Sequence, residues 1–145
     1  ADTQGTQTLF TGVPENPPSW TLNIPADTAV PYRATETPIG DVTVSDVQNV
    51  EDGYLIGCSV SNTDFASGAD IIPLTLEGDF YADGILYETK PISDGTPFEL
   101  YAGHEPSRVY STKVIALVEA GEWDAAAPGV YTATVTYTSR LYLGV

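Results

Sequence analysis

The chain has 145 residues, a length that suits one domain and is short for two. Its 20 acidic residues outnumber 5 basic ones, which gives a formal charge of −15, and such a surface repels nucleic-acid phosphates and anionic lipid headgroups. No stretch approaches the roughly 18 consecutive apolar residues of a membrane-spanning helix, so we expect neither nucleic-acid binding nor direct membrane insertion.

The composition also favours strands and an extracellular location. β-Branched and aromatic side chains, which are plentiful here, fit the pleated and half-buried surface of a sheet. The chain contains no Met and begins Ala1-Asp2-Thr3, as a mature protein does once a leader has been removed. Together with the acidity, this predicts a secreted or cell-surface protein.

Residues 1–18 carry only weak strand signals. Thr3 to Thr11 has Leu9 and Phe10 as its only large apolar side chains, and Thr6 to Thr11 is a weak strand candidate. We expect an extended N-terminal segment that adds to an edge strand of its own sheet. The alternative is pairing with a neighbouring subunit by β-augmentation.

Strand signals of period two then follow at short intervals, separated by Gly, Pro, Asn and Asp. Successive side chains of a strand point to opposite faces, so each segment has one apolar and one polar face. The apolar faces are formed by Trp20, Leu22 and Ile24; by Val42 and Val44; by Tyr54, Ile56, Cys58 and Val60; and by Ile72, Leu74, Leu76 and Phe80.

The second half continues with a hairpin and a central strand. Asp83-Gly84 is a two-residue turn signal ahead of a strand at Ile85 to Thr89, and Pro97 to Ala102 is a weaker strand. Val109 to Val118 ends in five apolar residues, as a strand buried on both faces does. Glu119 to Ala127 predicts one or two helical turns before Pro128.

The segment from Tyr131 to Leu143 predicts a long antiparallel strand. One parity is almost wholly apolar and the other is Thr-rich. In all, about eight or nine strands indicate an all-β antiparallel β-sandwich of residues 1–145, immunoglobulin-like or jelly-roll. The buried parity comprises Tyr131, Ala133, Val135, Tyr137, Leu141 and Leu143.

Two segments carry a family resemblance. Residues 127–137, which read APGVYTATVTY, resemble the closing strand of immunoglobulin-like modules in bacterial surface and secreted proteins. Residues 20–26, which read WTLNIPA, are similar to the opening strand of such modules in Gram-positive exported proteins. The resemblance implies a sandwich fold and an extracellular location, and it carries no catalytic residues. At the Pro-Gly-x-Tyr corner we expect the Tyr131 ring in the core and its hydroxyl on a nearby backbone group.

The residues for nucleophilic or zinc chemistry are scarce. His104 is the only histidine and lies in a turn-like stretch, where we expect a solvated side chain. Cys58 is the only cysteine and shares a face with apolar residues, where we expect it in the core. One His and one Cys do not make a zinc site, and only a Cys58–His104 dyad stays open for nucleophilic chemistry. We therefore expect no enzyme activity.

Two further chemistries stay open. Calcium is the only cofactor that the sequence suggests. The candidate ligands, which match no calcium-binding motif, are Asp79 and Asp83 beside a hairpin and Asp64 and Asp70 around a loop. An intramolecular amide bond between Lys113 and Asn23 is conceivable because both residues lie on predicted strands.

Flat aromatic side chains suggest a ligand surface. Trp123 lies between Glu122 and Asp124 on a predicted loop, which makes it the candidate for an exposed ring that binds ligand together with Tyr101 and Tyr110. A loop aromatic residue that caps the end of the sandwich is the commoner outcome for such a position.

Three functions follow from this interpretation. The first is a non-catalytic structural or adhesive module, with binding residues on loops and sheet edges and an extracellular protein or glycan as partner. The alternatives are a carbohydrate-binding module and a subunit of an extracellular filament (pilus) or virion that assembles through strand edges.

Overall fold

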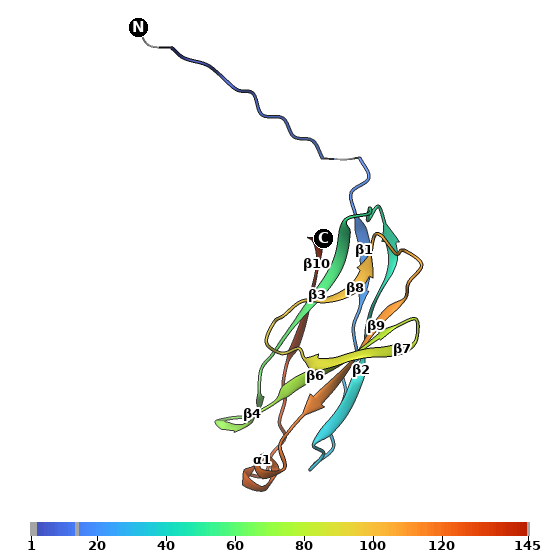
Figure 1. The fold of residues 1–145 in the computed structure, drawn as a ribbon. Coiled ribbons are helices and arrows are strands. Elements are labelled where there is room, and N and C mark those ends of the chain that lie inside the picture. Colours follow the sequence, from blue (N-terminus) through green and yellow to red (C-terminus); the bar gives the residue numbers. More distant parts are fainter. Residues whose placement is uncertain (1–2, 14, 145) are drawn as a thin grey trace.

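The computed structural model describes residues 3–13 and 15–144, and it shows the predicted all-β sandwich (Figure 1). One antiparallel sheet has the order β1-β2-β9-β6-β7, and the second has the order β10-β3-β8. A small two-stranded sheet pairs β4 with β5. The elements are β1 (Ser19–Asn23), β2 (Glu36–Gln48), β3 (Tyr54–Asn62), β4 (Phe65–Ser67), β5 (Asp70–Ile72), β6 (Thr75–Ala82), β7 (Ile85–Pro91), β8 (Phe98–Ala102), β9 (Tyr110–Leu117), α1 (Ala120–Ala125) and β10 (Val135–Leu143).

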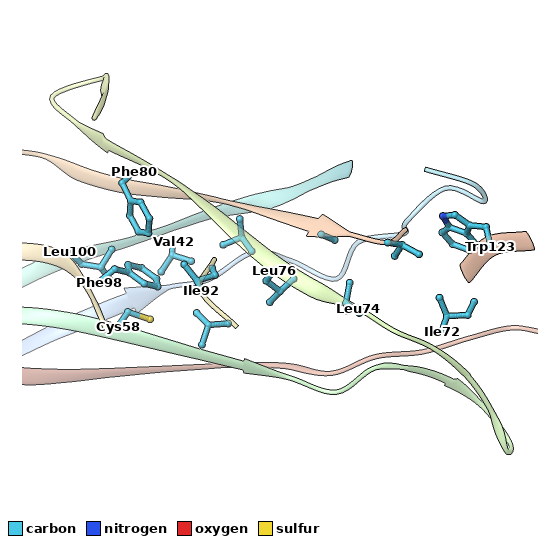
Figure 2. Close-up of a cluster of buried hydrophobic side chains, with 14 residues drawn as sticks. Val42, Cys58, Ile72, Leu74, Leu76, Phe80, Ile92, Phe98, Leu100 and Trp123 are labelled. Atoms are coloured by element: carbon cyan, nitrogen blue, oxygen red, sulfur yellow. The ribbon is translucent and has the colours of Figure 1, made fainter. Parts of the chain in front are cut away.

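The hydrophobic core lies between the two sheets (Figure 2). Leu76, Phe80 and Val114 come from the five-stranded sheet, and Cys58 and Phe98 come from the three-stranded sheet. Leu76, Phe80 and Cys58 fall on the parity that the alternation predicts for the buried face. The core role expected for Cys58 is confirmed, since the residue is fully buried.

Strand β9 is the middle strand of the five-stranded sheet, as its apolar run predicts. It pairs with β2 on one side and β6 on the other along nearly its whole length. Ile115 and Leu117, on its outer face, are half-buried because both neighbouring strands flank them.

The β6–β7 hairpin turns at Asp83-Gly84, also as predicted. Asp83 has φ 51° and Gly84 has φ 80°, and Ala82 pairs directly with Ile85. Two positive φ values in a two-residue loop match the right-handed twist of the flanking strands, which is why Asp-Gly occurs there.

The alternation over Ile72 to Phe80 does not form one strand. Pro73 lacks a backbone N–H, so β5 ends at Ile72 and β6 begins at Thr75. The Leu74 N–H between them donates to Asp64 Oδ1 at 2.9 Å. The short strands β4 and β5 account for the excess over the eight or nine strands expected.

The predicted strand from Tyr131 to Leu143 is regular only from Val135. Val135 pairs with Asn62, which is the last residue of β3. The residues before Val135 therefore have no β3 partner, and Thr132 exchanges two backbone hydrogen bonds with Ala66 of β4 instead. The expected burial of Leu141 and Leu143 is wrong, because they lie near the open end of the sandwich, and Leu143 is 74% exposed.

Trp20 closes one side of the sandwich. Its Nε1 donates to Ser139 Oγ at 2.9 Å, which joins the edge strands β1 and β10 of the two different sheets. The alternation with Leu22 and Ile24 predicts that the Trp20 ring lies in the core, whereas the ring is only half-buried.

Residues 3–13, which we call the arm, extend away from the sandwich (Figure 1). The weak strand expected over Thr6 to Thr11 is not formed, because this backbone pairs with no edge of its own sheets among the described residues. The arm leaves the end of the molecule where β1 begins, here called the arm pole. Helix α1 and strand β4 lie at the opposite end, the α1 pole (Figure 1).

The core predicts a large cost for truncating Phe80, whose ring packs 5.3 Å from that of Phe98. Phe80→Ala is expected to lower the free energy of unfolding by about 3–5 kcal/mol, because the side chain is 1% exposed and its removal leaves a cavity. Urea-induced unfolding measures this. Phe10→Ala on the arm is the matched control and should change stability by less than about 0.5 kcal/mol. Equal effects of the two substitutions would contradict this core.

Candidate functional site

A cleft of about 440 Å³ opens at the α1 pole, and its wall contains no charged side chain. Four aromatic rings dominate it, from the β1–β2 connection, from β4, from α1 and from the segment before β10. The volume is within the range of small-ligand pockets. The lining residues are Val30, Tyr32, Phe65, Ile72, Trp123, Ala126, Ala127, Pro128, Gly129 and Tyr131.

Helix α1 places Trp123 at the base of this cleft. Trp123 is the buried residue of the six-residue helix, and its indole lies at the end of the core beyond Ile72 (Figure 2). The indole Nε1 donates to the Ala34 carbonyl at 2.8 Å, and the Tyr32 ring stands edge-on to the indole at 5.6 Å. The hydrogen bond and the ring contact of Trp123 therefore attach the helix to the β1–β2 connection.

The segment before β10 forms the opposite wall. Tyr131 packs against the core, and its hydroxyl donates to the Ala127 carbonyl at 2.7 Å, which confirms the corner expected from the sequence. Gly129 lies against Ser67 of β4, where an added Cβ would stand 2.8 Å from the hydroxyl oxygen. A side chain at this position would force the Ser67 hydroxyl to move.

The rim of the cleft carries one ion pair. Arg33 Nη2 lies 2.8 Å from Asp124 Oδ1, and the guanidinium carbon is 5.8 Å from the centre of the Tyr32 ring. Both charged side chains are more than half exposed, so water and salt screen the pair and it adds little to stability. Arg33 and Asp124 do not line the cleft, whose lining contains only uncharged residues.

The three predicted ligand-binding aromatics do not come together. Trp123 is 8% exposed, so it caps the sandwich, which was the commoner outcome expected, and the alternative of an exposed ligand-binding ring is wrong. Tyr110 lies buried at the opposite end of β9, with its ring 6.5 Å from that of Tyr87. Tyr101 lies half-buried on β8. It lines neither the cleft nor a second pocket, which Tyr87 and Tyr110 line.

Sequence reasoning missed Tyr32 and Phe65 as cleft residues. Tyr32 follows Pro31 in a connection without periodicity, and Phe65 sits in a three-residue strand too short to show alternation. Tyr131 was identified only as a core residue. The one or two helical turns predicted over Glu119 to Ala127 are confirmed as α1, and this helix directs the indole of Trp123 inward although the charged residues Glu122 and Asp124 flank it.

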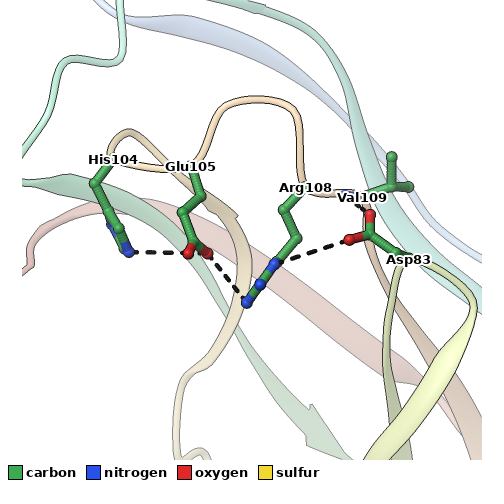
Figure 3. A network of polar contacts seen from close by, with 5 residues as sticks. All are labelled: Asp83, His104, Glu105, Arg108 and Val109. Carbon is green, nitrogen blue, oxygen red and sulfur yellow. Dashed lines mark hydrogen bonds and ion pairs between the residues drawn. The ribbon is translucent and has the colours of Figure 1, made fainter.

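His104 belongs to an exposed polar network (Figure 3). Its Nε2 lies 3.9 Å from Glu105 Oε2, which lies 3.1 Å from Arg108 Nη1. Arg108 Nε is 3.9 Å from Asp83 Oδ2, and Asp83 Oδ1 accepts from the Val109 N–H at 2.9 Å. The network ties the β8–β9 connection to the β6–β7 turn.

A Cys58–His104 dyad is not formed. Cys58 faces the sealed core, where its thiol donates to the Ser59 carbonyl, whereas the His104 side chain is largely exposed beside Glu105. The nucleophile–base contact that covalent catalysis requires is therefore missing between these two residues.

The calcium candidates lie in separate places. Asp79 Oδ1 accepts from Thr89 Oγ1 at 2.8 Å on the outer sheet face, and Asp70 is exposed on β5. Asp64 and Asp83 each bind a backbone N–H. Within residues 3–13 and 15–144, no three His, Cys, Asp or Glu side chains are grouped closely enough to hold a metal ion.

The conceivable Lys113–Asn23 bond does not fit the sheet. Strand β2 lies between β1, which carries Asn23, and β9, which carries Lys113. The exposed Asn23 amide donates to Thr43 and Ser45 of β2 at 3.2 and 3.1 Å. Lys113 instead places its ammonium 5.8 Å from the centre of the Tyr81 ring.

Comparisons with protein-family models, curated proteins and solved structures found no match for this chain. None of the helices in the described part of the chain is long and apolar enough to span a membrane. The function proposed below is therefore argued from the arm, the cleft and the charge of the molecule.

Two acidic groups on the three-stranded sheet, the buried thiol of Cys58 and the half-buried hydroxyl of Tyr137, have raised pKa values. Burial raises the pKa of the Cys58 thiol from an ordinary 9.0 to about 11. Burial, followed by repulsion from Cys58, raises the pKa of Tyr137 from 10.0 to about 12. Both groups lie on the paired strands β3 and β10.

The free energy of unfolding should therefore fall at alkaline pH. A raised folded-state pKa means that the unfolded chain loses its proton first, so the contribution of Tyr137 is complete below pH 10 and is lost as the pH rises to about 12. Urea titrations across this range should give a stability difference between wild type and Tyr137→Phe that changes with pH. A difference that stays constant across the range would show that Tyr137 is not desolvated in the folded state.

Proposed function

We propose that this chain is a non-catalytic structural module of a secreted or cell-surface protein, and that copies associate with one another through the arm. An immunoglobulin-like module of the bacterial surface type is the relation that the strand resemblance supports. The partner in this proposal is a second copy of the chain. The proposal therefore combines two functions suggested by the sequence, a structural module and a filament subunit.

The arm is the observation that carries the proposal. Leu9, Phe10 and Val13 are each more than 80% exposed, although they are the large apolar groups of this segment. Burying one such side chain lowers the free energy by about 1.5–3 kcal/mol, so the hydrophobic effect favours any contact that covers these side chains. Residues 3–13 lie clear of their own sandwich (Figure 1), so that contact must come from elsewhere.

Charge restricts where two copies can touch. At −15 each, the sandwiches repel one another, which keeps a module soluble. Residues 3–13 contain no charged side chain in a chain with 20 acids. An uncharged segment can approach a second acidic copy without adding to the repulsion, so the arm is suited to self-association.

The carbohydrate-binding alternative has weaker support. Stacking on a sugar ring needs an exposed aromatic face, and Trp123 is buried edge-on to Tyr32. Tyr32 is the more exposed ring of that pair. Binding on a glycan array that is lost in Tyr32→Ala would favour this alternative over the proposal.

Removal of residues 1–13 tests the proposal. Sedimentation over a wide range of protein concentrations should show that the full chain associates and that the shortened chain stays monomeric. A full-length variant with Leu9, Phe10 and Val13 all replaced by Ser is the control for chain length, and it should behave like the shortened chain. A full chain that is monomeric throughout would refute the proposed association.

A further inference from the structure

We infer that the arm of one copy binds in the aromatic cleft of the next copy, so that copies join head to tail in an open chain. This inference rests on the proposed self-association and assigns the acceptor site, which the association alone does not specify.

The arm and the cleft lie at opposite poles of the sandwich (Figure 1). The arm precedes Ser19 at the start of β1, while the cleft is built around α1 and β4 at the far end. A contact between two different surfaces is heterologous, and it produces an open chain unless a rotation closes it into a ring.

The arm of one copy points away from its own cleft. It leaves the sandwich at the arm pole, and the fully extended backbone from Phe10 to Ser19 spans at most about 32 Å. To enter its own cleft at the α1 pole, the arm would have to reverse its direction at Ser19 and run back along the outside of the sandwich (Figure 1). A second copy can receive the arm in the direction that it already has.

The most exposed apolar side chains gather at these two places. Among the large apolar residues of the described chain, Phe10, Val13, Val130 and Leu9 are the four most exposed, at 90%, 87%, 85% and 83%. Three of them belong to the arm. Val130 lies between two residues that line the cleft, and Tyr32 on the opposite wall is 72% exposed.

The chemistry of the two surfaces is complementary. The cleft offers Tyr32, Phe65 and Tyr131 as ring partners for the side chain of Phe10, and aromatic pairs add about 0.5–1.5 kcal/mol to the gain from burial. Neither the wall of the cleft nor residues 3–13 contains a charged group. The contact therefore buries no unpaired charge on either copy.

Side chains rather than backbone pairing would hold the arm. The nearest strand, β4, already pairs with β5 on one side, and Ala66 exchanges both backbone bonds with Thr132 on the other. Strand β4 is therefore paired on both sides at Ala66, and the arm cannot add to it there by backbone hydrogen bonds. Phe10 and Leu9 supply most of the binding energy, because a few buried side chains usually do so in a protein interface.

The edge strand β7 is the competing acceptor. Its Ile85, Leu86 and Tyr87 are exposed side by side at the edge of the five-stranded sheet. The arm would add to this edge by backbone pairing. The experiment below separates the two acceptors.

Four single substitutions form the test. Phe10→Asp disables the arm, Tyr32→Asp puts a charge into the cleft, and Ile85→Asp puts the same charge on the β7 edge, where the side chain is 71% exposed, as Tyr32 is at 72%. Val130→Asp is a second cleft variant, because Tyr32 contacts Trp123 and its replacement alone could disturb the fold. Circular dichroism and urea unfolding establish that each variant is folded.

Sedimentation of the full-length proteins then decides. Phe10→Asp, Tyr32→Asp and Val130→Asp should each weaken self-association by about tenfold to a hundredfold, which matches the loss of one buried apolar anchor. Ile85→Asp should associate like wild type. A mixture of Phe10→Asp with Tyr32→Asp should form a one-to-one complex that grows no further, because only one intact arm and one intact cleft remain.

Other results would overturn the inference. Association that is lost in Phe10→Asp and Ile85→Asp but kept in both cleft variants would assign the arm to β7, and the proposed function would stand. Wild type that stops at two copies would show a closed exchange of arms instead of an open chain. A monomeric wild type would remove both the inference and the proposed function.

Discussion

The two sheets stay together because the apolar half of each strand meets the apolar half of the facing sheet and leaves water. Val114, on the central strand, lies in one cluster with Phe80 of β6 and Cys58 of β3. At roughly 25 cal/mol per Å² of buried apolar surface, this contact is the main favourable contribution to folding. The connections, the helix and the arm are positioned only because this layer of side chains fixes the direction of every strand.

The same two layers explain why the candidate site lies at a pole. Side chains between the sheets pack closely, so a cleft forms only where the sheets end and loops must cover the last core residues. Trp123 closes the core at the α1 pole, and Tyr32 and Tyr131 continue the aromatic lining outward from it. The cleft is an extension of the core into solvent, which is why its wall is apolar and uncharged.

Charge gives the rest of the surface a different character. With 20 acids against 5 bases, nearly every copy-to-copy contact would bring like charges together. Only uncharged surfaces escape this penalty, and the arm and the cleft are two of them. Exposed polar networks, such as the one that joins His104, Glu105 and Arg108, brace connections locally (Figure 3). The distribution of charge thus separates a strongly acidic surface from the uncharged, apolar arm and cleft.

The sequence by itself determined the fold class, the buried parity of most strands, the Asp83-Gly84 turn and the central place of β9, because alternation and turn chemistry act between residues close in the chain. It also predicted the hydrogen bond at the Tyr131 corner. Tertiary structure alone decided that Pro73 splits one strand, that Trp123 turns inward and that Tyr32 meets Phe65 across a cleft. These outcomes depend on which distant segments meet at a pole, and no local pattern encodes that meeting.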